Sequence, residues 1–289
     1  MMHMGDLHYS NITQNLPALY RRAIDRVMTS PTQASLYRNV PVTYVWDDHD
    51  FGANDCDRTS VSRNSALGVY RQCVPHYPLS DIGDDHASVH QTFTVGRVRF
   101  IVTDCRACRD PIRTADTLDK SMLGKAQLDW LDRQLRAASP YPLVVWVNPL
   151  PWITREGGSN HGWQQYSSER IWIADRIKEY GLMRRLVMLS GDAHLAAIDD
   201  GTNSNYTTGH SPDERGFVIA HAAPLDRLTN SKGGPYSHGF SKRNHQFGLL
   251  KVEDDGATLS AEITCRDVDG AVINGLSIRL TWRDGSYTV

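Results

Sequence analysis

The order of apolar runs and amphipathic segments constrains the fold of this chain more than any other feature. Four runs are long and apolar enough to form buried strands: PVTYVW (41–46), PLVVWVN (142–148), RLVMLSG (185–191) and GFVIAH (216–221). Three segments carry apolar residues at helical spacing: residues 14–30, 125–138 and 167–181, the last with Gly181 as a stop signal. Such alternation predicts an α/β fold built from packed layers.

The remaining segments predict additional strands and one irregular stretch. QTFTVGRVRFIVTD (91–104) has the pattern of a hairpin with a turn near Gly96, and residues 52–90 predict a long polar excursion with a short helix. From about residue 246 the pattern is all strand, in FGLLKVE, ATLSAEITC and LSIRLTW. Because no linker interrupts these segments, we expect one domain over residues 1–289 with a β-rich part from about residue 246.

Composition excludes several classes of protein. With 40% hydrophobic and 22% charged residues the chain can bury a full core, and a net charge of -2 indicates no nucleic-acid-binding patch. No apolar run is long enough for a transmembrane segment, and no signal peptide is visible. Cys105 and Cys108 have a CxxC spacing, but a zinc site would need a second pair, so free thiols are expected among the five cysteines.

Polar clusters follow three of the predicted strands. DDHD (47–50) follows the first, Asn148 ends the second, and DAH (192–194) follows the third. Sites in α/β sheets form at the carboxyl ends of strands, and a further cluster, GDLHY, opens the chain. One metal site could therefore collect Asp6, Tyr9, Asp48, Asn148, Asp192 and His194.

These residue types suit a particular chemistry. Oxygen-rich ligands with a few imidazoles favour hard or borderline cations, and two such ions would need a bridging carboxylate, for which Asp6 is the candidate. Two cations can hold a phosphoryl group and activate water for hydrolysis of a phosphate ester. His49, inside DDHD, is placed to protonate the leaving group.

Each cluster also has a purely structural explanation. GDLHY alone is typical of a turn, DDHD alone could cap the N-terminus of a helix, and Asn148 before proline could form a turn. Their occurrence together at successive strand ends is what favours a metal site.

Several motifs, taken together, resemble one family. GDLHY, YVWDDHDFGAND, FIVTDCRACRD, MLGKAQLDWLDRQL, SGDAHLAAIDDG and HAAPLDR followed by GGPYSHG run in the order of the PhoD-like (alkaline phosphatase D) metallophosphatases of the calcineurin-like phosphoesterase superfamily. The resemblance implies a four-layer α/β/β/α sandwich of two mixed sheets. It also implies a phosphoric ester hydrolase that uses two metal ions, with Ca, Fe, Mn and Zn as candidates, on a small phosphate-ester substrate.

The resemblance also implies roles for individual residues. Asp6 would bridge two metals, and Tyr9 sits where the related GDxxY motif supplies a phenolate to iron. Asp48 and His49 take the places of the Asn and His of the superfamily's GNH motif, a metal ligand and the general acid.

The other matching positions are metal ligands and one arginine. Asp192 and His194 take the two ligand positions of GHxH, and Asn148 falls where the superfamily usually has a ligating His. Arg106, in TDCR, would be either a phosphate contact or the partner of a buried ion pair.

The chain departs from the family at its start. Family members have an earlier strand that brings the first metal ligand, so the resemblance implies that this first strand is missing and that Asp6 lies on an unsupported, fraying terminus. Two alternatives therefore stay open beside the phosphoesterase: a degenerate member with an incomplete first metal site, acting as a binding or structural protein, and a metal hydrolase acting on lipid or nucleotide phosphodiesters.

Overall fold

A seven-stranded sheet forms the centre of the molecule. The computed structural model describes residues 1–79, 86–154, 162–230, 232–283 and 286–288. In sheet order the strands are β3 (Gln91–Val95), β4 (Val98–Val102), β5 (Leu143–Val147), β6 (Leu186–Ser190), β8 (Val218–Ala222), β7 (Ala196–Asp199) and β9 (Phe240–Ser241). Strands β4, β5, β6 and β8 are parallel, so their carboxyl ends lie along one edge. The predicted hairpin is confirmed as the antiparallel pair β3–β4.

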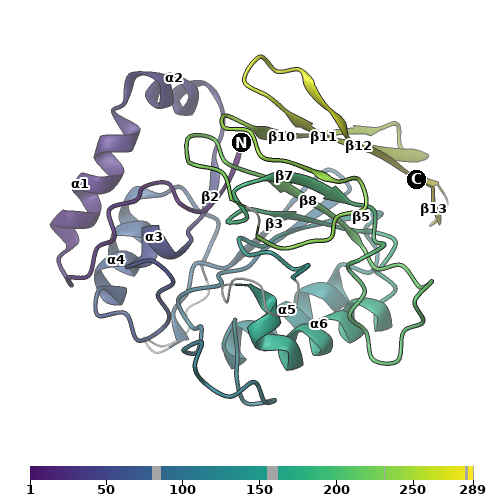
Figure 1. The fold of residues 1–289 in the computed structure, drawn as a ribbon, viewed down its shortest axis with the longest axis horizontal. Helices are drawn as coiled ribbons and strands as arrows, with labels where there is room; N and C mark the ends of the chain where they lie inside the picture. Colours follow the sequence, from purple (N-terminus) through teal and green to yellow (C-terminus); the bar gives the residue numbers. More distant parts are fainter. Residues whose placement is uncertain (80–85, 155–161, 231, 284–285, 289) are drawn as a thin grey trace.

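Two helices cover one face of this sheet, as Figure 1 shows. They are α5 (Lys125–Ala137) and α6 (Ser167–Glu179), which follows the short 3₁₀ helix at Trp163–Tyr166. Leu131 and Leu135 of α5 are fully buried in the same cluster as Trp146 of β5. Both predicted helices are confirmed, and Gly181 follows α6 with a φ of +67°, a left-handed conformation that glycine adopts without strain.

A four-stranded antiparallel sheet packs on the other face. Its strands are β10 (Phe247–Asp254), β11 (Thr258–Arg266), β12 (Val272–Arg283) and β13 (Ser286–Thr288). Leu259 and Ile278 of this sheet share one buried cluster with Val145 and Val187 of the large sheet. The β-rich C-terminal part therefore shares a core with the large sheet, and the single-domain assignment stays a prediction.

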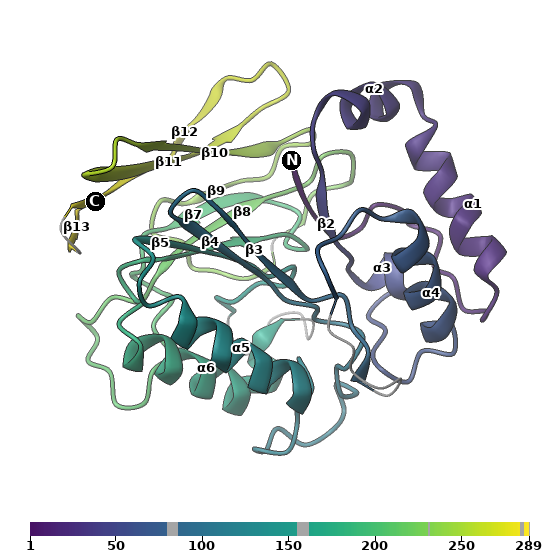
Figure 2. The same cartoon turned by 180° about the vertical axis from the view of Figure 1, so that it is seen from behind.

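The predicted α/β class is confirmed, and the fourth layer that the resemblance implies stays a prediction. In the described residues the outer face of the four-stranded sheet has no helix over it, and the remaining helices lie beside the sheets (Figure 2). The physical reason is the polarity of that face: Lys251, Glu253 and Arg279 point outward and form ion pairs with one another. A polar face needs no covering layer.

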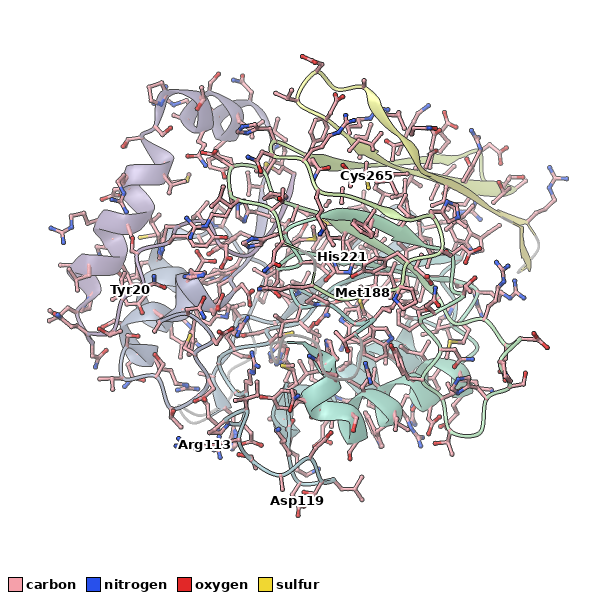
Figure 3. The ribbon with its side chains drawn as sticks, viewed as in Figure 1. Tyr20, Arg113, Asp119, Met188, His221 and Cys265 are labelled. Atoms are coloured by element: carbon pink, nitrogen blue, oxygen red, sulfur yellow. The ribbon has the colours of Figure 1, made fainter. Side chains whose placement is uncertain are left out.

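The N-terminal quarter consists of helices and two strands, and Tyr20 on its first helix (Figure 3) belongs to the same buried cluster as Val145 of the large sheet. This quarter contains β1 (Met2–Met4), α1 (Pro17–Met28), α2 (Pro31–Asn39), β2 (Thr43–Val45), α3 (Asp48–Phe51) and α4 (Arg63–Cys73). None of the helices in the described residues is long and apolar enough to cross a membrane.

The prediction of an unsupported terminus is wrong. Strand β1 pairs in parallel with β2, with Met4 opposite Val45, so a hydrogen-bonded strand ends just before Asp6. The terminal amine also donates to the carbonyl of Pro41 at 2.6 Å. The further strand that the resemblance implies ahead of Met1 stays a prediction.

Candidate metal centre

Three strand ends meet at one point because two glycines allow close contact. Asp6 follows β1, Asp48 follows β2 and Asp192 follows β6. A Cβ on Gly5 would lie 2.4 Å from the Cβ of Asp47, and one on Gly191 would lie 2.7 Å from the carbonyl oxygen of Met4. Any larger residue at either position would push the strand ends apart, so these glycines bring the acidic residues together.

Among the residues that the structure describes, Asp6, Asp48 and His49 form a close group of possible ligands. One donor atom from each lies within 4.8 Å of the other two, a spacing that one cation could bridge. The carboxylates come from two different segments, and His49 extends the second one by a residue. The structure therefore brings together three residues that the sequence analysis assigned to one site.

Tyr9, Asp192 and His194 border this group. The Tyr9 hydroxyl lies 3.4 Å from Nε2 of His194, and the Tyr9 ring lies 4.3 Å from the ring of His49. Asp6, Asp192 and His194 all have φ between +51° and +57°, a left-handed conformation that is strained for residues other than glycine. Such strain persists where surrounding structure enforces it, and it concentrates at functional sites.

The donor atoms of this site fit a cation. Within the described part of the chain, Oδ1 of Asp6, Oδ1 of Asp48 and Oδ2 of Asp192 are buried and accept no hydrogen bond. Buried carboxylate oxygens almost always have a partner, because leaving one unpaired costs about 1–3 kcal/mol or more. Carboxylate oxygens without a hydrogen bond, here on three predicted ligands, are donors that a hard cation prefers.

The pKa values of two of these carboxyls move in opposite directions. Burial, together with the carboxylates of Asp47, Asp48 and Asp50, raises the pKa of Asp6 to about 10. Burial also disfavours the charged form of Asp48, but the positive charge of Arg106 and His49 outweighs it, and the pKa of Asp48 falls well below its usual range. A cation binding here would displace the proton from Asp6, so metal affinity should rise with pH.

A second layer of contacts holds the DDHD segment in place. The Asp50 carboxylate accepts from the backbone N–H of His8 and of Asp47, each at 3.1 Å, and so ties the GDLHY loop to the DDHD segment. Asp47 and Asp50 form a capping box on α3. The structural explanation of DDHD as a helix cap is therefore also correct, for Asp47 and Asp50, while Asp48 and His49 face the site.

Arg106 pairs with a carboxylate in the interior. Its side chain is fully buried, and Nε lies 2.5 Å from Oδ1 of Asp47, while Nη2 lies 3.7 Å from Oδ1 of Asp48. Of the two roles left open by the sequence, this contact matches the buried ion pair. Arg106 is placed to hold DDHD, and a phosphate contact by its buried guanidinium has no support in this geometry.

The Arg106 loop is in turn fixed by α5. Gln127, in the QLDWL stretch, accepts from the N–H of Asp104 and donates to its carbonyl, both at 2.8 Å. The Asp104 carboxylate accepts from the N–H of Arg106 at 2.9 Å. The sequence analysis used QLDWL as part of a predicted helix and of a family signature, and the support that Gln127 gives to this loop was missed.

Asn148 ends β5 as predicted, but its contacts are with the core. Its Oδ1 accepts from the thiol of Cys105 at 2.9 Å and lies 3.4 Å from Oγ1 of Thr103. Its amide nitrogen donates to the carbonyl of Leu150 at 2.7 Å. Its role as a metal ligand stays a prediction.

Three residues at the site were missed from the sequence. Lys232 donates to Oδ1 of Asp192 at 2.7 Å, Asn11 Oδ1 lies 2.6 Å from Nδ1 of His49, and the Arg227 guanidinium lies 3.9 Å from the centre of the Tyr9 ring. Asn11 is five residues from Asp6 and could have been suspected. Arg227 ends the HAAPLDR motif, which was used only for the family resemblance, and Lys232 lies five residues further along the chain, outside the quoted motifs.

Comparison with known proteins identifies the family. Residues 2–221 match the PhoD-like phosphatase family. The chain belongs to this family. Its fold is also similar to that of the solved structure described as "Structure of PhoD", with a TM-score of 0.70 and 15% sequence identity over 99% of this chain and 65% of the other. This PhoD-like chain thus spans 65% of the length of that protein, and no curated protein matches it.

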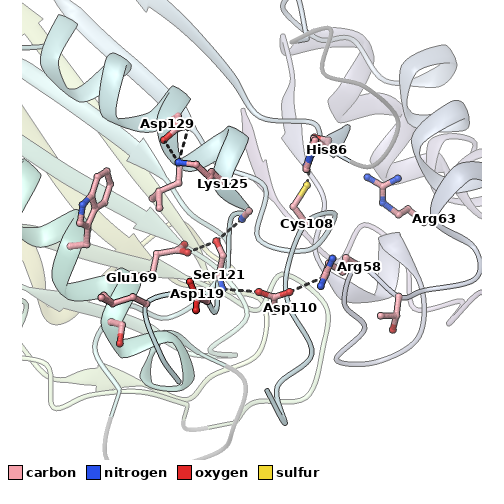
Figure 4. A pocket seen from close by; sticks show the side chains of 16 residues that line it. Arg58, Arg63, His86, Cys108, Asp110, Asp119, Ser121, Lys125, Asp129 and Glu169 are labelled. Carbon is pink, nitrogen blue, oxygen red and sulfur yellow. Dashed lines mark hydrogen bonds and ion pairs between the residues drawn. The ribbon is translucent and has the colours of Figure 1, made fainter. Parts of the chain in front are cut away.

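A larger cavity of about 960 Å³ lies elsewhere in this PhoD-like chain, between α5, α6 and the residues near Arg58 (Figure 4). Two of its arginines already have partners: Arg58 pairs with Asp110 at 2.8 Å, and Arg63 donates to the carbonyls of Ala87 and Ala107. The unpaired carboxylates lie at the strand ends instead. We therefore place the candidate functional site at these strand ends, although the cavity beside them is smaller than this one.

One carboxyl in this cavity predicts a pH effect on stability. Glu169 accepts from the N–H groups of Met122 and Leu123 and from the hydroxyl of Ser121, and burial raises its pKa to about 7. Between its unfolded pKa of about 4.5 and about 7 the folded protein binds more protons than the unfolded chain, so stability falls as pH rises through that window. We expect Glu169→Gln to remove up to roughly 1.4 kcal/mol per pH unit of this slope in urea denaturation.

The control is Glu179→Gln, on the exposed part of the same helix, which should keep the wild-type slope. Urea midpoints at pH 5, 6, 7 and 8 for the three proteins make the comparison. Equal slopes for wild type and Glu169→Gln would contradict the assignment.

Proposed function

We propose that this chain is a metal-dependent phosphoesterase that hydrolyses phosphate mono- or diesters with water, at a centre of two metal ions. The candidate ions are Ca, Fe, Mn and Zn. The observation that supports it best is that Asp6, Asp48 and Asp192, each of which follows a strand end, all have a buried carboxylate oxygen that accepts no hydrogen bond in the described residues. Membership of the PhoD-like phosphatase family supports the same reaction class.

The ligands we propose come from four segments. Asp6 would bridge the ions, and the remaining ligands would be Tyr9, Asp48, Asn148, Asp192 and His194. Bound cations supply positive charge that stabilises the phosphoryl oxygens and lowers the pKa of water. Asp192 can contribute Oδ2 while its Oδ1 keeps Lys232, whose ammonium adds a further positive charge beside the site.

The chain's own proton donor in this proposal is His49. Its Nδ1 donates to Oδ1 of Asn11, which leaves Nε2 as the nitrogen available to the site. Burial has the largest effect on His49 and lowers its pKa. The carboxylate of Asp48, the preceding residue, acts in the opposite direction and favours the protonated imidazole. Protonated His49 would donate to the leaving oxygen as the ester bond breaks.

A single substitution separates proton donation from metal binding by His49. We expect His49→Ala to lower turnover by roughly 10²–10⁴-fold while metal content stays near that of wild type, because general acid catalysis contributes about that much. Metal is measured by elemental analysis of the purified protein. His76→Ala, at an exposed histidine, is the control. Loss of metal in His49→Ala would make His49 a ligand, in agreement with its place beside Asp6 and Asp48.

The proposed function is tested with metal-loaded protein and two substrates. We expect turnover of p-nitrophenyl phosphate or of its bis-ester after supplying Ca, Mn, Fe or Zn, and loss of turnover with a chelator. Bound metal without turnover of these esters, or of lipid and nucleotide diesters, would overturn the enzyme assignment and favour a binding protein. Activity confined to lipid or nucleotide diesters would narrow the substrate class.

A further inference from the structure

The metal centre opens onto two adjoining hollows with arginines at their rims. A cavity of about 350 Å³ is lined by Asp6, Tyr9, Asp192 and His194 on one side and by Arg227 on the other. Arg26, on α1, also lines this cavity. A second hollow of about 560 Å³, beside Ser10–Gln14, meets the first at Tyr9 and Arg26. The cavity beside the proposed ligands is therefore lined by Arg26 and Arg227, and Arg22 lines only the second hollow.

Neither guanidinium is used by the proposed metal chemistry. Arg227 lies over the ring of Tyr9, 3.9 Å from its centre, and Arg26 donates to the hydroxyl of Ser10 at 3.0 Å. Within the described residues, neither has an ion pair with a carboxylate, and both side chains are exposed. Their charged groups thus remain available to an anion from solution.

The carboxylates at this cavity have other roles or lie at its edge. Asp6 and Asp192 are assigned to metal ions, and the third, Asp226, is exposed beside Arg227. Arg26 and Arg227 therefore line the same cavity as four of the proposed metal ligands. Guanidinium matches phosphate with paired N–H donors, and the stacked Tyr9 ring restricts the orientation of Arg227.

We propose that Arg26 and Arg227 bind a second phosphate on the organic part of the substrate. This inference rests on the proposed function, and it adds a substrate class: phosphate esters whose organic part carries a further phosphate group. The metal centre would hold the ester that is cleaved, and the two arginines would hold the group that is not. Both arginines act in binding and specificity.

The test uses two substrates that differ by one phosphate. They are thymidine 5′-(p-nitrophenyl phosphate) and the same compound with a 3′-phosphate. We expect the 3′-phosphorylated ester to have a kcat/KM about tenfold higher, and we expect Arg227→Gln and Arg26→Gln each to lower this ratio several-fold. Because exposed charges are screened, the ratio should also fall as NaCl is raised.

Two further variants sharpen the comparison. Arg21→Gln removes a charge from the same helix, but Arg21 bonds to Gln72 away from the cavity, so the ratio should stay at the wild-type value. Asp226→Asn removes the competing carboxylate and should raise the ratio. Circular dichroism confirms that each variant is folded.

A binding measurement separates this inference from the proposed function. Calorimetry with the metal-loaded protein compares thymidine 3′,5′-bisphosphate with thymidine 5′-monophosphate, and we expect a lower Kd for the bisphosphate that depends on Arg26 and Arg227. Turnover with equal kcat/KM for the two esters, together with equal Kd values for the bisphosphate and the monophosphate, would overturn the second subsite. The phosphoesterase proposal would then stand. Absence of turnover with arginine-dependent binding of the bisphosphate would overturn the phosphoesterase and keep the subsite.

Discussion

Asp6→Asn is expected to abolish metal binding and turnover while the metal-free fold stays nearly as stable as wild type. Asn tolerates the left-handed conformation at this position, where φ is +57°. With a pKa of about 10 the Asp6 carboxyl is neutral at pH 7 in the metal-free protein, so a neutral amide replaces a neutral acid. Only the metal-bound state, which needs the carboxylate, loses a ligand.

Two measurements on the same samples follow from this. Added metal should raise the Tm of wild type, because a ligand that binds only the folded state stabilises it, and should leave the Tm of Asp6→Asn unchanged. Turnover should fall on the order of a thousandfold, since a metal ion supplies several kcal/mol of transition-state stabilisation. Asp129→Asn, at an exposed carboxylate of α5, is the control. A metal-dependent rise in Tm in Asp6→Asn would remove Asp6 from the ligand set.

Arg106→Ala is expected to cost about 3–5 kcal/mol of stability, the largest effect on folding that we predict. The substitution leaves Asp47 buried without the guanidinium 2.5 Å from its carboxylate and removes positive charge near Asp48. An unpaired buried charge is expensive because water no longer solvates it. Urea denaturation of the metal-free protein measures the loss. The stability of Arg106→Lys should lie between that of wild type and that of Arg106→Ala, because lysine keeps the charge without the paired donors.

A double-mutant cycle with Asp47→Ala tests whether the ion pair is the cause. If the pair carries the cost, the double variant should be less destabilised than the sum of the two single variants, by roughly 1–3 kcal/mol. Additive costs would attribute the loss to the packing of the Arg106 side chain instead. Turnover of Arg106→Ala at a temperature where it is folded then reports how far Arg106 positions Asp48.

Local patterns were sufficient for most of the secondary structure. The 3.6-residue period and the apolar face with Leu131 and Leu135 were enough to predict helix α5. The hairpin at Gly96 and the stop at Gly181 depend on backbone conformations that glycine favours. Strand β1 was missed, because three residues are too short for a period to be recognised.

Part of the site was predictable for the same reason. Asp6, Asp48 and Asp192 each follow directly from a strand, and strand ends in α/β folds converge, so their chain positions already imply proximity. The roles of Asp47 and Asp50 were only partly visible, since the capping box on α3 involves backbone groups that become available when that short helix forms.

The sequence by itself determined the kinds of element, the acidic and imidazole groups at their ends, and the family. Only the tertiary structure decided which groups meet. Arg106 lies 59 residues from Asp47, and Lys232 lies 40 residues from Asp192, and no periodicity links positions so far apart. It also decided that β2 pairs with β1 outside the large sheet and that the polar face of the second sheet has no helix over it in the described residues. These outcomes depend on how burial, charge pairing and close backbone contact are satisfied together in three dimensions, which no single segment encodes.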